Sequence, residues 1–394
     1  MGGVSGRTFA AAAAGFVMCV GMVSAAQSQT PGVSQTEIRI GTFGPMTGAN
    51  FVFGKNTMNG VETVFQKINE SGGIHGRKLT LVREDDQCDP ATAITVVRKL
   101  IHTDNVFGII GGGCSNAVLA AKPDIVEAKI PFVNFAAAAE SISAPPVPNI
   151  YTTMLTSALE SKLQVKYAME QGYKRIAVVA QKDAWGRDRY NPLMEEMKRL
   201  DITPVADEEL SVNANDATAQ VLKIREAKPD AVIMLVYPKP AAIFLRDAAK
   251  IGYKTAFIGQ SVLPDPVAFD QQVGVPGATD SFVTISPVQY GLSDEQVAEW
   301  RKRIETMFPG DKLHGYNLYG IAAGQIYAEA LRRAGPNLTR EGFLAALGSM
   351  SDYEVDVYPG KVSCQANVSH QCHKNAAWIR KDGDRIKVIA ITKL

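Results

Sequence analysis

Residues 38–90, IRIGTFGPMTGANFVFGKNTMNGVETVFQKINESGGIHGRKLTLVREDDQCDP, decide the fold of this chain. The stretch overlaps an apolar run at Glu37–Phe43 that predicts a strand, and a second strand is predicted at Lys78–Glu84. Between them, the apolar residues of Thr57–Ser71 recur at helical spacing. A strand, a helix and a second strand in this order form the unit from which parallel sheets are built.

The same alternation continues along the first half of the chain. Helices are predicted at Ala91–His102 and Ala117–Ala128, and strands at Val106–Ile110 and Pro131–Phe135. The proline-rich segment Ala144–Asn149 then interrupts the pattern. This alternation predicts a parallel sheet with helices on both faces.

A second alternating series follows the proline-rich segment. Its predicted strands are Arg175–Ala180, Pro204–Leu210, Asp230–Val236 and Ala256–Ile258, and its predicted helices are Ala158–Gln171, Arg187–Leu200, Ala217–Ala227 and Ala241–Ile251. Two doubly wound α/β units in series indicate two similar lobes. The remaining elements do not complete a third domain, so we expect them to return to these lobes: helices Asp294–Phe308, Tyr316–Ala334 and Arg340–Leu347, and a hairpin around Asp382–Asp384.

The first 26 residues are typical of a secretory signal peptide. Arg7 is the only charged side chain before residue 37, and it precedes the apolar run Thr8–Val23 and the small residues Ser24–Ala26. An uncleaved anchor is the alternative, but the run is shorter than the ~20 residues that span a bilayer. Cys19 lacks the small neighbours of a lipidation site. We expect cleavage near Ala26 and a soluble mature protein in the periplasm.

The charge balance excludes several classes of partner. The chain has 41 basic and 40 acidic residues, and removal of Arg7 with the signal peptide leaves the two numbers equal. A protein without net charge offers no field that attracts nucleic acid or an anionic membrane. No later stretch is long and apolar enough for a transmembrane helix. The remaining length is sufficient for two domains of roughly 100–200 residues each.

Four cysteines remain after Cys19 is removed, namely Cys88, Cys114, Cys364 and Cys372. An even number in an oxidising compartment predicts disulfides, with three possible pairings. Cys364, His370, Cys372 and His373 form the one cluster that suggests zinc, but their spacing differs from the usual zinc arrangements. A local disulfide between Cys364 and Cys372 is the preferred interpretation, and we expect no metal.

Signals of enzyme chemistry are weak. Gly54–Asn56 resembles the end of a phosphate-binding loop, but Gly48 lies one residue too far away and Asn replaces the magnesium-binding hydroxyl. The carboxylates of Asp85–Asp89 suggest acid–base groups or metal ligands, whereas their neighbour Cys88 favours a structural role. No dinucleotide fingerprint or nucleophile elbow is present. We therefore expect neither an enzyme nor a cofactor.

Two loops after predicted strands are suited to bind a carboxylate. Ligands of parallel sheets bind at the carboxyl ends of the strands, where helix N-termini present N–H groups. Gly111–Asn116 and Ala136–Glu140 lie at such ends, and Ser115 adds a hydroxyl donor. An ordinary strand–helix turn is the alternative for each loop.

Several blocks of sequence resemble the leucine/isoleucine/valine-binding protein family, the periplasmic solute-binding proteins of ABC transporters. They are residues 38–90, Gly113–Ser115, DAWG at 183–186 and LRDAAKIGYKTAFIG at 245–259. The resemblance implies the type I periplasmic binding protein fold, in which two Rossmann-like lobes joined by a three-strand hinge close around a ligand. It places lobe 1 at 37–152 and 284–373, and lobe 2 at 153–283 and 374–394.

The resemblance also assigns roles to single residues of the first lobe. Cys88 and Cys114 match the family's disulfide, and Ser115 matches the hydroxyl that binds the ligand carboxylate. Ala137 and Ala138 lie in the second carboxylate loop, where amino acid binders of the family often have a threonine.

Aromatic positions that line the family's cleft are matched by Phe53, Trp185, Tyr237 and Tyr316. Ser261 stands where the family has an acid that binds the ligand ammonium. An ammonium in a closed cleft needs strong acceptors, so the absence of this acid favours a carboxylate without an α-amino group.

The resemblance implies a solute-binding component of an ABC transporter. Its ligand is expected to be a branched-chain amino acid or an aromatic or aliphatic carboxylate, and its partner the permease subunits in the inner membrane. We expect a monomer that binds no nucleic acid. A ligand-sensing module of an amide- or acid-responsive signalling system is the alternative, but cytoplasmic sensors lack a signal peptide.

Overall fold

A computed structural model of the chain describes residues 1–6, 30–48, 50–365 and 370–393. The first half forms a five-stranded sheet, here called the first sheet, in which every pair of neighbouring strands is parallel and the strand order is β2-β1-β3-β4-β5. Its strands are β1 (Glu37–Gly44), β2 (Lys78–Asp85), β3 (Gly108–Gly111), β4 (Phe132–Asn134) and β5 (Ile150–Thr152).

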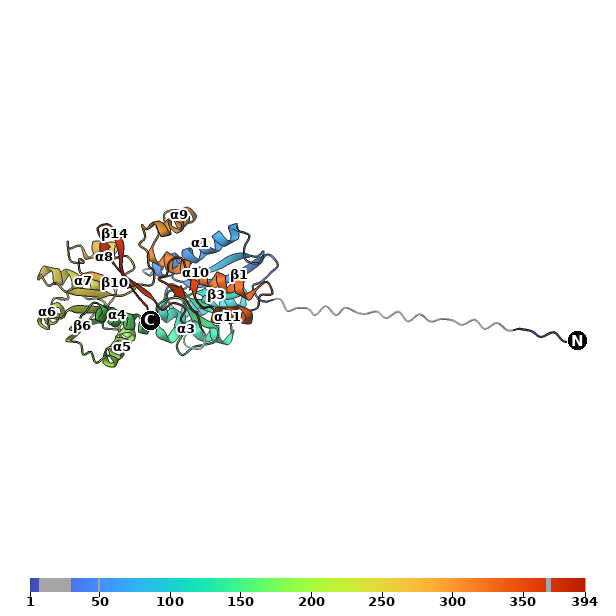
Figure 1. The fold of residues 1–394 in the computed structure, drawn as a ribbon, viewed down its shortest axis with the longest axis horizontal. Coiled ribbons are helices and arrows are strands. Elements are labelled where there is room, and N and C mark those ends of the chain that lie inside the picture. Colours follow the sequence, from blue (N-terminus) through green and yellow to red (C-terminus); the bar gives the residue numbers. More distant parts are fainter. Residues whose placement is uncertain (7–29, 49, 366–369, 394) are drawn as a thin grey trace.

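Helices from two distant parts of the chain cover the first sheet. The early helices are η1 (Phe51–Phe53), α1 (Lys55–Glu70), α2 (Pro90–His102), α3 (Ser115–Glu127) and η2 (Glu140–Ile142). The late ones are η3 (Glu295–Val297), α9 (Ala298–Met307), α10 (Gly315–Ala334) and α11 (Arg340–Gly348), followed by the short strands β11 (Tyr353–Glu354) and β12 (Lys361–Val362). In Figure 1, α10 in orange lies beside α1 in blue. A Cβ at Gly320 of α10 would lie 1.9 Å from the carbonyl oxygen of Thr57, so these helices approach closely because glycine is present.

The second sheet has seven strands in the order β14-β13-β10-β9-β8-β6-β7. Its five strands from β10 to β7 are parallel, whereas β13 and β14 are antiparallel to their neighbours. The strands are β6 (Ile176–Gln181), β7 (Ala206–Leu210), β8 (Ala231–Leu235), β9 (Ala256–Gly259), β10 (Phe282–Ser286), β13 (Ala376–Asp382) and β14 (Arg385–Thr392). The helices of this half are α4 (Ser157–Glu170), α5 (Ala184–Arg199), α6 (Thr218–Glu226), α7 (Pro238–Lys250) and α8 (Pro266–Val273).

The chain passes three times between the two sheets, after β5, after β10 and before β13. The first and third passages are hydrogen-bonded to each other. The N–H of Thr152 donates to the carbonyl of His370 (2.8 Å), and the N–H of Cys372 donates to the carbonyl of Thr152 (2.8 Å). The side-chain amide of Gln371 donates to the carbonyl of Met154 at 2.5 Å. Two α/β sheets joined by three passages confirm the predicted fold class.

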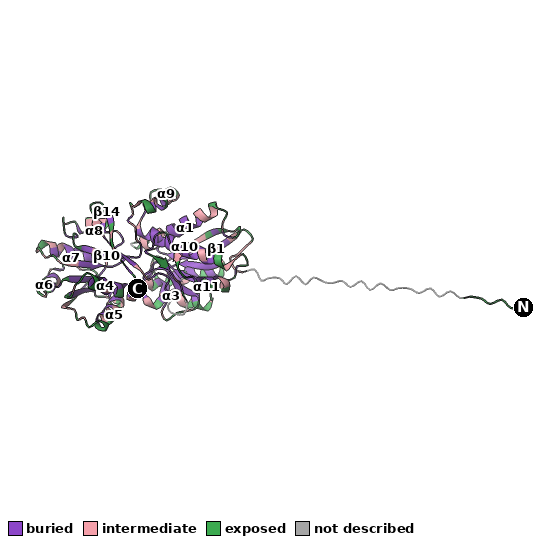
Figure 2. Cartoon of the chain, viewed as in Figure 1, coloured by how far each residue is buried: buried purple, intermediate pink, exposed green. Residues whose placement is uncertain are grey.

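Burial follows the two sheets. Figure 2 shows buried residues concentrated in their strands and in the helix faces against them, with separate apolar clusters for each sheet. The five residues of β8, AVIML, are all buried, as expected for a central parallel strand covered on both faces. The expected lobe boundary at residues 283/284 falls inside β10, which pairs only within the second sheet. The division into two lobes remains a proposal.

Both predicted disulfides are present. Cys88 is bonded to Cys114 across 26 residues, and Cys364 to Cys372 across 8 residues. Most of the predicted signal peptide lies outside the described residues, which omit 7–29. Within the described ranges, no helix is long and apolar enough to cross a membrane.

Candidate ligand-binding site

Helix α4 carries a row of buried polar side chains toward the second sheet. It begins directly after the first passage between the sheets, and each of Ser157, Glu160, Ser161 and Gln164 is fully buried. Residues three and four apart share one face of a helix, so these side chains lie along one side of α4. The amide of Gln164 donates to the carbonyl of Gly259 (3.1 Å), and the hydroxyl of Ser161 donates to the carbonyl of Arg189 (3.0 Å). This row joins α4 to β9 and α5.

Glu160 provides a carboxylate beside Ser261. Its Oε1 accepts from the N–H of Ser261 at 2.6 Å, and its Oε2 accepts from the Ser261 hydroxyl at 3.1 Å. Burial raises the pKa of Glu160, although Arg189 and the bonds from Ser261 act in the opposite direction. The hydroxyl of Tyr319, from α10, donates to the Ser261 carbonyl at 3.3 Å. A buried carboxylate therefore lies beside position 261, but it comes from α4 and is bonded to Ser261 itself.

Arg189 stacks on two of the predicted aromatic residues. Its guanidinium carbon lies 3.8 Å from the ring centroid of Trp185, and the Trp185 ring stacks on Tyr237 at 4.1 Å. Arg189 is buried, and this burial lowers its pKa, whereas Glu160 and nearby groups raise it. Burial also raises the pKa of Tyr237 to about 12, so the phenol is neutral at physiological pH. The arrangement places a buried cation against a flat aromatic wall.

The turn before α5 fixes this aromatic wall. Asp183 caps the helix by accepting from the N–H of Gly186 at 2.8 Å. A Cβ at Gly186 would lie 1.9 Å from the carbonyl oxygen of Gln181, so only glycine allows this approach to the end of β6. The side chain of Gln181 donates to Asp183 (2.8 Å) and accepts from the N–H of Tyr237 (3.1 Å). Trp185 and Tyr237 are thereby held at the carboxyl ends of β6 and β8.

Tyr316 and Phe53 lie on the side of the first sheet. Their ring centroids are 5.1 Å apart, and Tyr316 packs edge-on against Tyr319 at 5.0 Å. Tyr316 is in the first turn of α10, where its N–H donates to Nδ1 of the capping residue His314 at 3.2 Å. Burial raises the pKa of Tyr316, with Glu160 adding to this effect and Arg189 opposing it. Tyr316 is therefore within electrostatic reach of both buried charges.

The two predicted carboxylate loops are bonded to each other. The half-buried Ser115 begins α3, and its hydroxyl accepts from the N–H of Ala139 at 3.2 Å. The N–H of Ala137 donates to the carbonyl of Gly112 (2.9 Å), so it is already engaged. The carbonyl of Ala138 accepts from the N–H of Ser157 at 2.8 Å. The loops of the first sheet therefore meet the start of α4.

Several buried polar atoms around this region have no hydrogen-bond partner among the described residues. They are the hydroxyl of Ser157, Nε of Arg189 and both amide atoms of Gln260. Gln260 is fully buried and lies next to Ser261 in the chain. Buried polar groups are almost always hydrogen-bonded. These atoms therefore indicate a place where a polar ligand or a water molecule forms the missing hydrogen bonds.

The sequence predicted eight ligand residues, and the structure brings them together in groups. Ser261 lies beside Glu160, Trp185 beside Tyr237, Tyr316 beside Phe53, and Ser115 beside the Ala137–Ala138 loop. Sequence reasoning missed Glu160 and Arg189. Arg189 follows Trp185 by four residues, a helical spacing that could have identified it. The roles of all these residues in ligand binding remain predictions.

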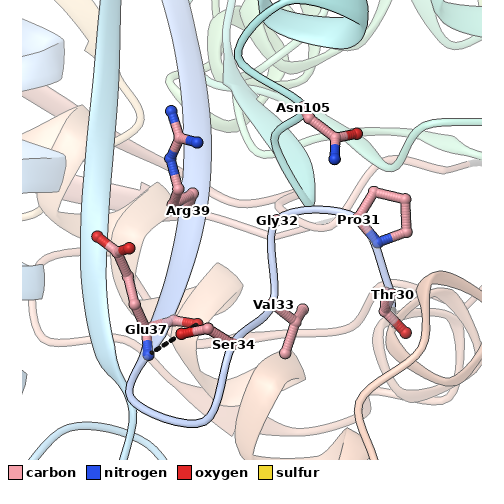
Figure 3. A pocket seen from close by; sticks show the side chains of 8 residues that line it. All are labelled: Thr30, Pro31, Gly32, Val33, Ser34, Glu37, Arg39 and Asn105. Carbon is pink, nitrogen blue, oxygen red and sulfur yellow. Dashed lines mark hydrogen bonds between the residues drawn. The ribbon is translucent and has the colours of Figure 1, made fainter. Parts of the chain in front are cut away.

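Two cavities lie away from these residues. Figure 3 shows one of about 250 Å³ at the amino end of β1, where Arg39 and Asn105 face it and the N–H of Glu37 donates to the Ser34 hydroxyl at 2.9 Å. Ligands of parallel sheets bind at the opposite, carboxyl ends of the strands. A second cavity of about 340 Å³ is lined by residues of α1, α9 and α10, among them Trp300, and by Tyr353.

The cysteine–histidine cluster near the third passage is structural. Cys364 and Cys372 are bonded to each other, and the ring of His373 stacks on Tyr358 at 3.9 Å. The ring of His370 stacks on Tyr151 at 4.2 Å. In the ranges that the structure describes, no group of three or more His, Cys, Asp or Glu residues is placed to hold a metal.

Comparisons with known proteins agree with this architecture. Residues 37–382 match the family model described as periplasmic binding protein. The chain is 26% identical to the Leu/Ile/Val-binding protein homolog 7 of Brucella abortus (strain 2308) over 348 residues, which cover 84% of each protein.

Two solved structures show the same fold. A branched-chain amino acid transporter substrate-binding protein of Streptococcus pneumoniae, solved with isoleucine, is 19% identical with a TM-score of 0.74, and the match covers 91% of this chain and 99% of that one. A fatty acid ABC transporter substrate-binding protein of Thermomonospora curvata is also 19% identical, with a TM-score of 0.75 and coverage of 93% and 95%. The family model spans most of the chain, which confirms that the protein binds solutes rather than catalysing a reaction: it belongs to the periplasmic binding protein family.

Proposed function

We propose that this protein is the periplasmic solute-binding component of an ABC transporter. The observation that carries the proposal is the meeting of polar and aromatic residues from both sheets around the start of α4. The hydroxyl of Tyr319, from α10 beside the first sheet, donates to the carbonyl of Ser261 after β9 (3.3 Å), and the carbonyl of Ala138 accepts from the N–H of Ser157 (2.8 Å). A ligand at this place contacts both halves of the protein. Binding therefore favours a closed arrangement by a hinge motion of the three passages.

The proposed ligand is a small organic acid with an apolar or aromatic body. Trp185, Tyr237 and Phe53 offer flat surfaces that are partly exposed. The Ser115 hydroxyl uses an oxygen lone pair to accept from Ala139, so its hydrogen is available to donate to a carboxylate oxygen. The relative from Brucella abortus is named for leucine, isoleucine and valine, so branched-chain amino acids belong to the candidates.

Within this class, the ligand either carries an α-ammonium group beside its carboxylate or lacks one. Both oxygens of Glu160 already accept hydrogen bonds from Ser261, and the Arg189 cation is nearby. An α-ammonium group would compete with these groups for the one carboxylate. We therefore propose that an acid without the amino group binds more tightly than the corresponding amino acid.

A thermal-shift screen tests this function. A ligand that binds only the folded state raises the melting temperature by mass action. The screen should contain the aliphatic and aromatic amino acids, the corresponding acids without the amino group, and sugars as unrelated solutes. Stabilisation by acids or amino acids is expected. Calorimetry of leucine against 4-methylpentanoate then decides the charge preference, and tighter binding of leucine would overturn it. No stabilisation by any amino acid or acid would contradict the proposed function.

A further inference from the structure

The guanidinium of Arg189 has donors that the described protein does not use. An arginine side chain carries five N–H donors and no acceptor. Arg189 is only 3% exposed, yet among the described residues its side chain makes a single hydrogen bond, from Nη1 to the carbonyl of Trp185 at 3.4 Å. Its Nε has no hydrogen-bond partner in the described residues. A buried cation with unused donors destabilises the folded protein unless another group accepts its hydrogen bonds and offsets its charge.

No carboxylate of the described residues fills this role. Asp188 is the only one within 4 Å of the guanidinium, and its oxygen lies 3.8 Å from Nη1, beyond hydrogen-bond length. Glu160 offsets the charge at longer range, but its two oxygens accept from Ser261. These carboxylates therefore leave Nε and most of the other donors of Arg189 without a hydrogen-bond partner among the described residues.

The surroundings of Arg189 fix the plane of its donors. The Trp185 ring covers one face of the guanidinium at 3.8 Å, and Tyr237 supports that ring from behind at 4.1 Å. A stacked guanidinium keeps its edge free, and the N–H groups along that edge match the two oxygens of a carboxylate. The carbonyl of Arg189 accepts from the hydroxyl of Ser161 (3.0 Å), in the helix α4 that begins directly after the first passage between the sheets. The position of Arg189 therefore lies toward the junction between the halves.

We propose that Arg189 pairs with the anionic group of the ligand, so that the site selects organic acids over their neutral amides. This inference rests on the proposed function and names the residue that determines its ligand class. A carboxylate has about four acceptor positions on its two oxygens, so it can accept two bonds from the edge of the guanidinium and still accept from a further donor. Arg189 is then the cation that compensates the ligand's charge.

The test compares matched acids and amides. The probes are 3-phenylpropanoate with 3-phenylpropanamide, and 4-methylpentanoate with 4-methylpentanamide, each titrated calorimetrically into the full mature protein. We expect at least one acid to bind about 100-fold more tightly than its amide, because a charged bidentate pair is lost with the amide. Arg189→Met should abolish this difference by weakening the acid, while leaving amide binding unchanged. Arg189→Lys should restore part of it.

Controls separate this inference from folding and from the proposed function. Arg187→Met, at an exposed position of the same helix, should leave both affinities unchanged. If Arg189→Met does not fold, Glu160→Gln/Arg189→Met removes both buried charges and takes its place. Equal affinities of the unmodified protein for acid and amide, or full affinity of the Arg189 variants for the acid, would overturn this inference. Neither result would contradict the proposed function. Failure of every solute in the screen to bind would remove the proposed function, and the inference with it.

Discussion

The carboxylate of Glu160 is bonded to Ser261 through both of its oxygens, which accept from the backbone N–H at 2.6 Å and from the hydroxyl at 3.1 Å. Glu160 comes from α4 and Ser261 follows β9, about a hundred residues later in the chain. These bonds fix α4 to the carboxyl end of strand β9 in the second sheet. They also hold a buried carboxyl group near Arg189. Burial raises the pKa of this carboxyl, and the Arg189 cation acts in the opposite direction.

Removal of the Glu160 charge should destabilise the protein. Glu160→Gln leaves the buried Arg189 without the carboxylate that offsets its charge at longer range and disturbs the bonds from Ser261, which should cost about 1–3 kcal/mol, less than the loss of a directly bonded buried pair. Glu160→Gln/Arg189→Met removes both charges, so its cost should be smaller than the sum of the two single variants. Urea unfolding measures these free energies. Glu195→Gln, at an exposed position of α5, is the matched control, and a Glu160 variant as stable as this control would refute a stabilising role of the buried carboxylate.

Replacement of Ser115 by alanine should weaken ligand binding more than folding. The variant loses a donor to the ligand carboxylate, and a hydrogen bond to a charged group is worth about 1.5–3 kcal/mol, or roughly 10- to 150-fold in affinity. It also loses the bond from Ala139 at 3.2 Å, which should lower stability by about 1 kcal/mol. Calorimetry with the strongest ligand of the screen gives the affinity. Ser141→Ala, at a nearby exposed position, should bind normally, and equal affinities of the two variants would argue against Ser115 as a ligand residue.

The two disulfides should differ in their contribution. Loss of the Cys88–Cys114 bond, by alanine at both positions, should cost about 3–4 kcal/mol, because it closes 26 residues. Loss of the Cys364–Cys372 bond, which closes 8 residues, should cost about 2–3 kcal/mol. Only the first variant should also weaken ligand binding, since Ser115 follows Cys114 directly. Peptide mapping without reduction checks the pairing, and free thiols at Cys88 and Cys114 would disprove it.

Stability should decrease with rising pH because of Asp86. This carboxyl is fully buried, and burial raises its pKa from 3.8 to about 6, although the N–H of Cys88 donates to it at 2.8 Å. The folded state therefore binds the proton more tightly than the unfolded state. The contribution of Asp86 is fully present below pH 4 and is lost as the pH rises through about 6, on the order of 3 kcal/mol.

Asp86→Asn removes this titration. Urea unfolding of the protein and the variant at pH 4, 5, 6, 7 and 8 should show a stability difference that changes mainly between pH 4 and 6 and is nearly constant from pH 7 to 8. A difference that is independent of pH over this range would show that Asp86 has an ordinary pKa in the folded protein.

The alternation of strands and helices was predictable because it depends on local periodicity. Helix α10 is observed at Gly315–Ala334 where Tyr316–Ala334 was expected, and β1 at Glu37–Gly44 where Glu37–Phe43 was expected. Strand β5, which follows the proline-rich segment that interrupts the pattern, was not predicted, and neither were α8 and β10. Long amphipathic elements therefore carry their own signal, whereas short ones are defined by their neighbours in the sheet.

The charged part of the candidate site was not predictable from periodicity. Helix α4 buries polar and apolar residues alike, with Glu160 and Gln164 as fully covered as Leu163. A sequence pattern assigns such polar side chains to solvent, because it contains no information on which partner covers them. Ser261 was singled out from the sequence, but the acid beside it, Glu160, lies on a different element. Pairs of this kind become visible only when the chain is folded.

The central claim, that a solute is captured by closure of two halves, is tested most directly by small-angle X-ray scattering of the mature protein. The radius of gyration should be measured without ligand and at saturation with the strongest binder from the screen. We predict a smaller radius in the bound state, because ligand contacts come from residues on both sides of the three passages. An unchanged radius at proven saturation would contradict capture by closure.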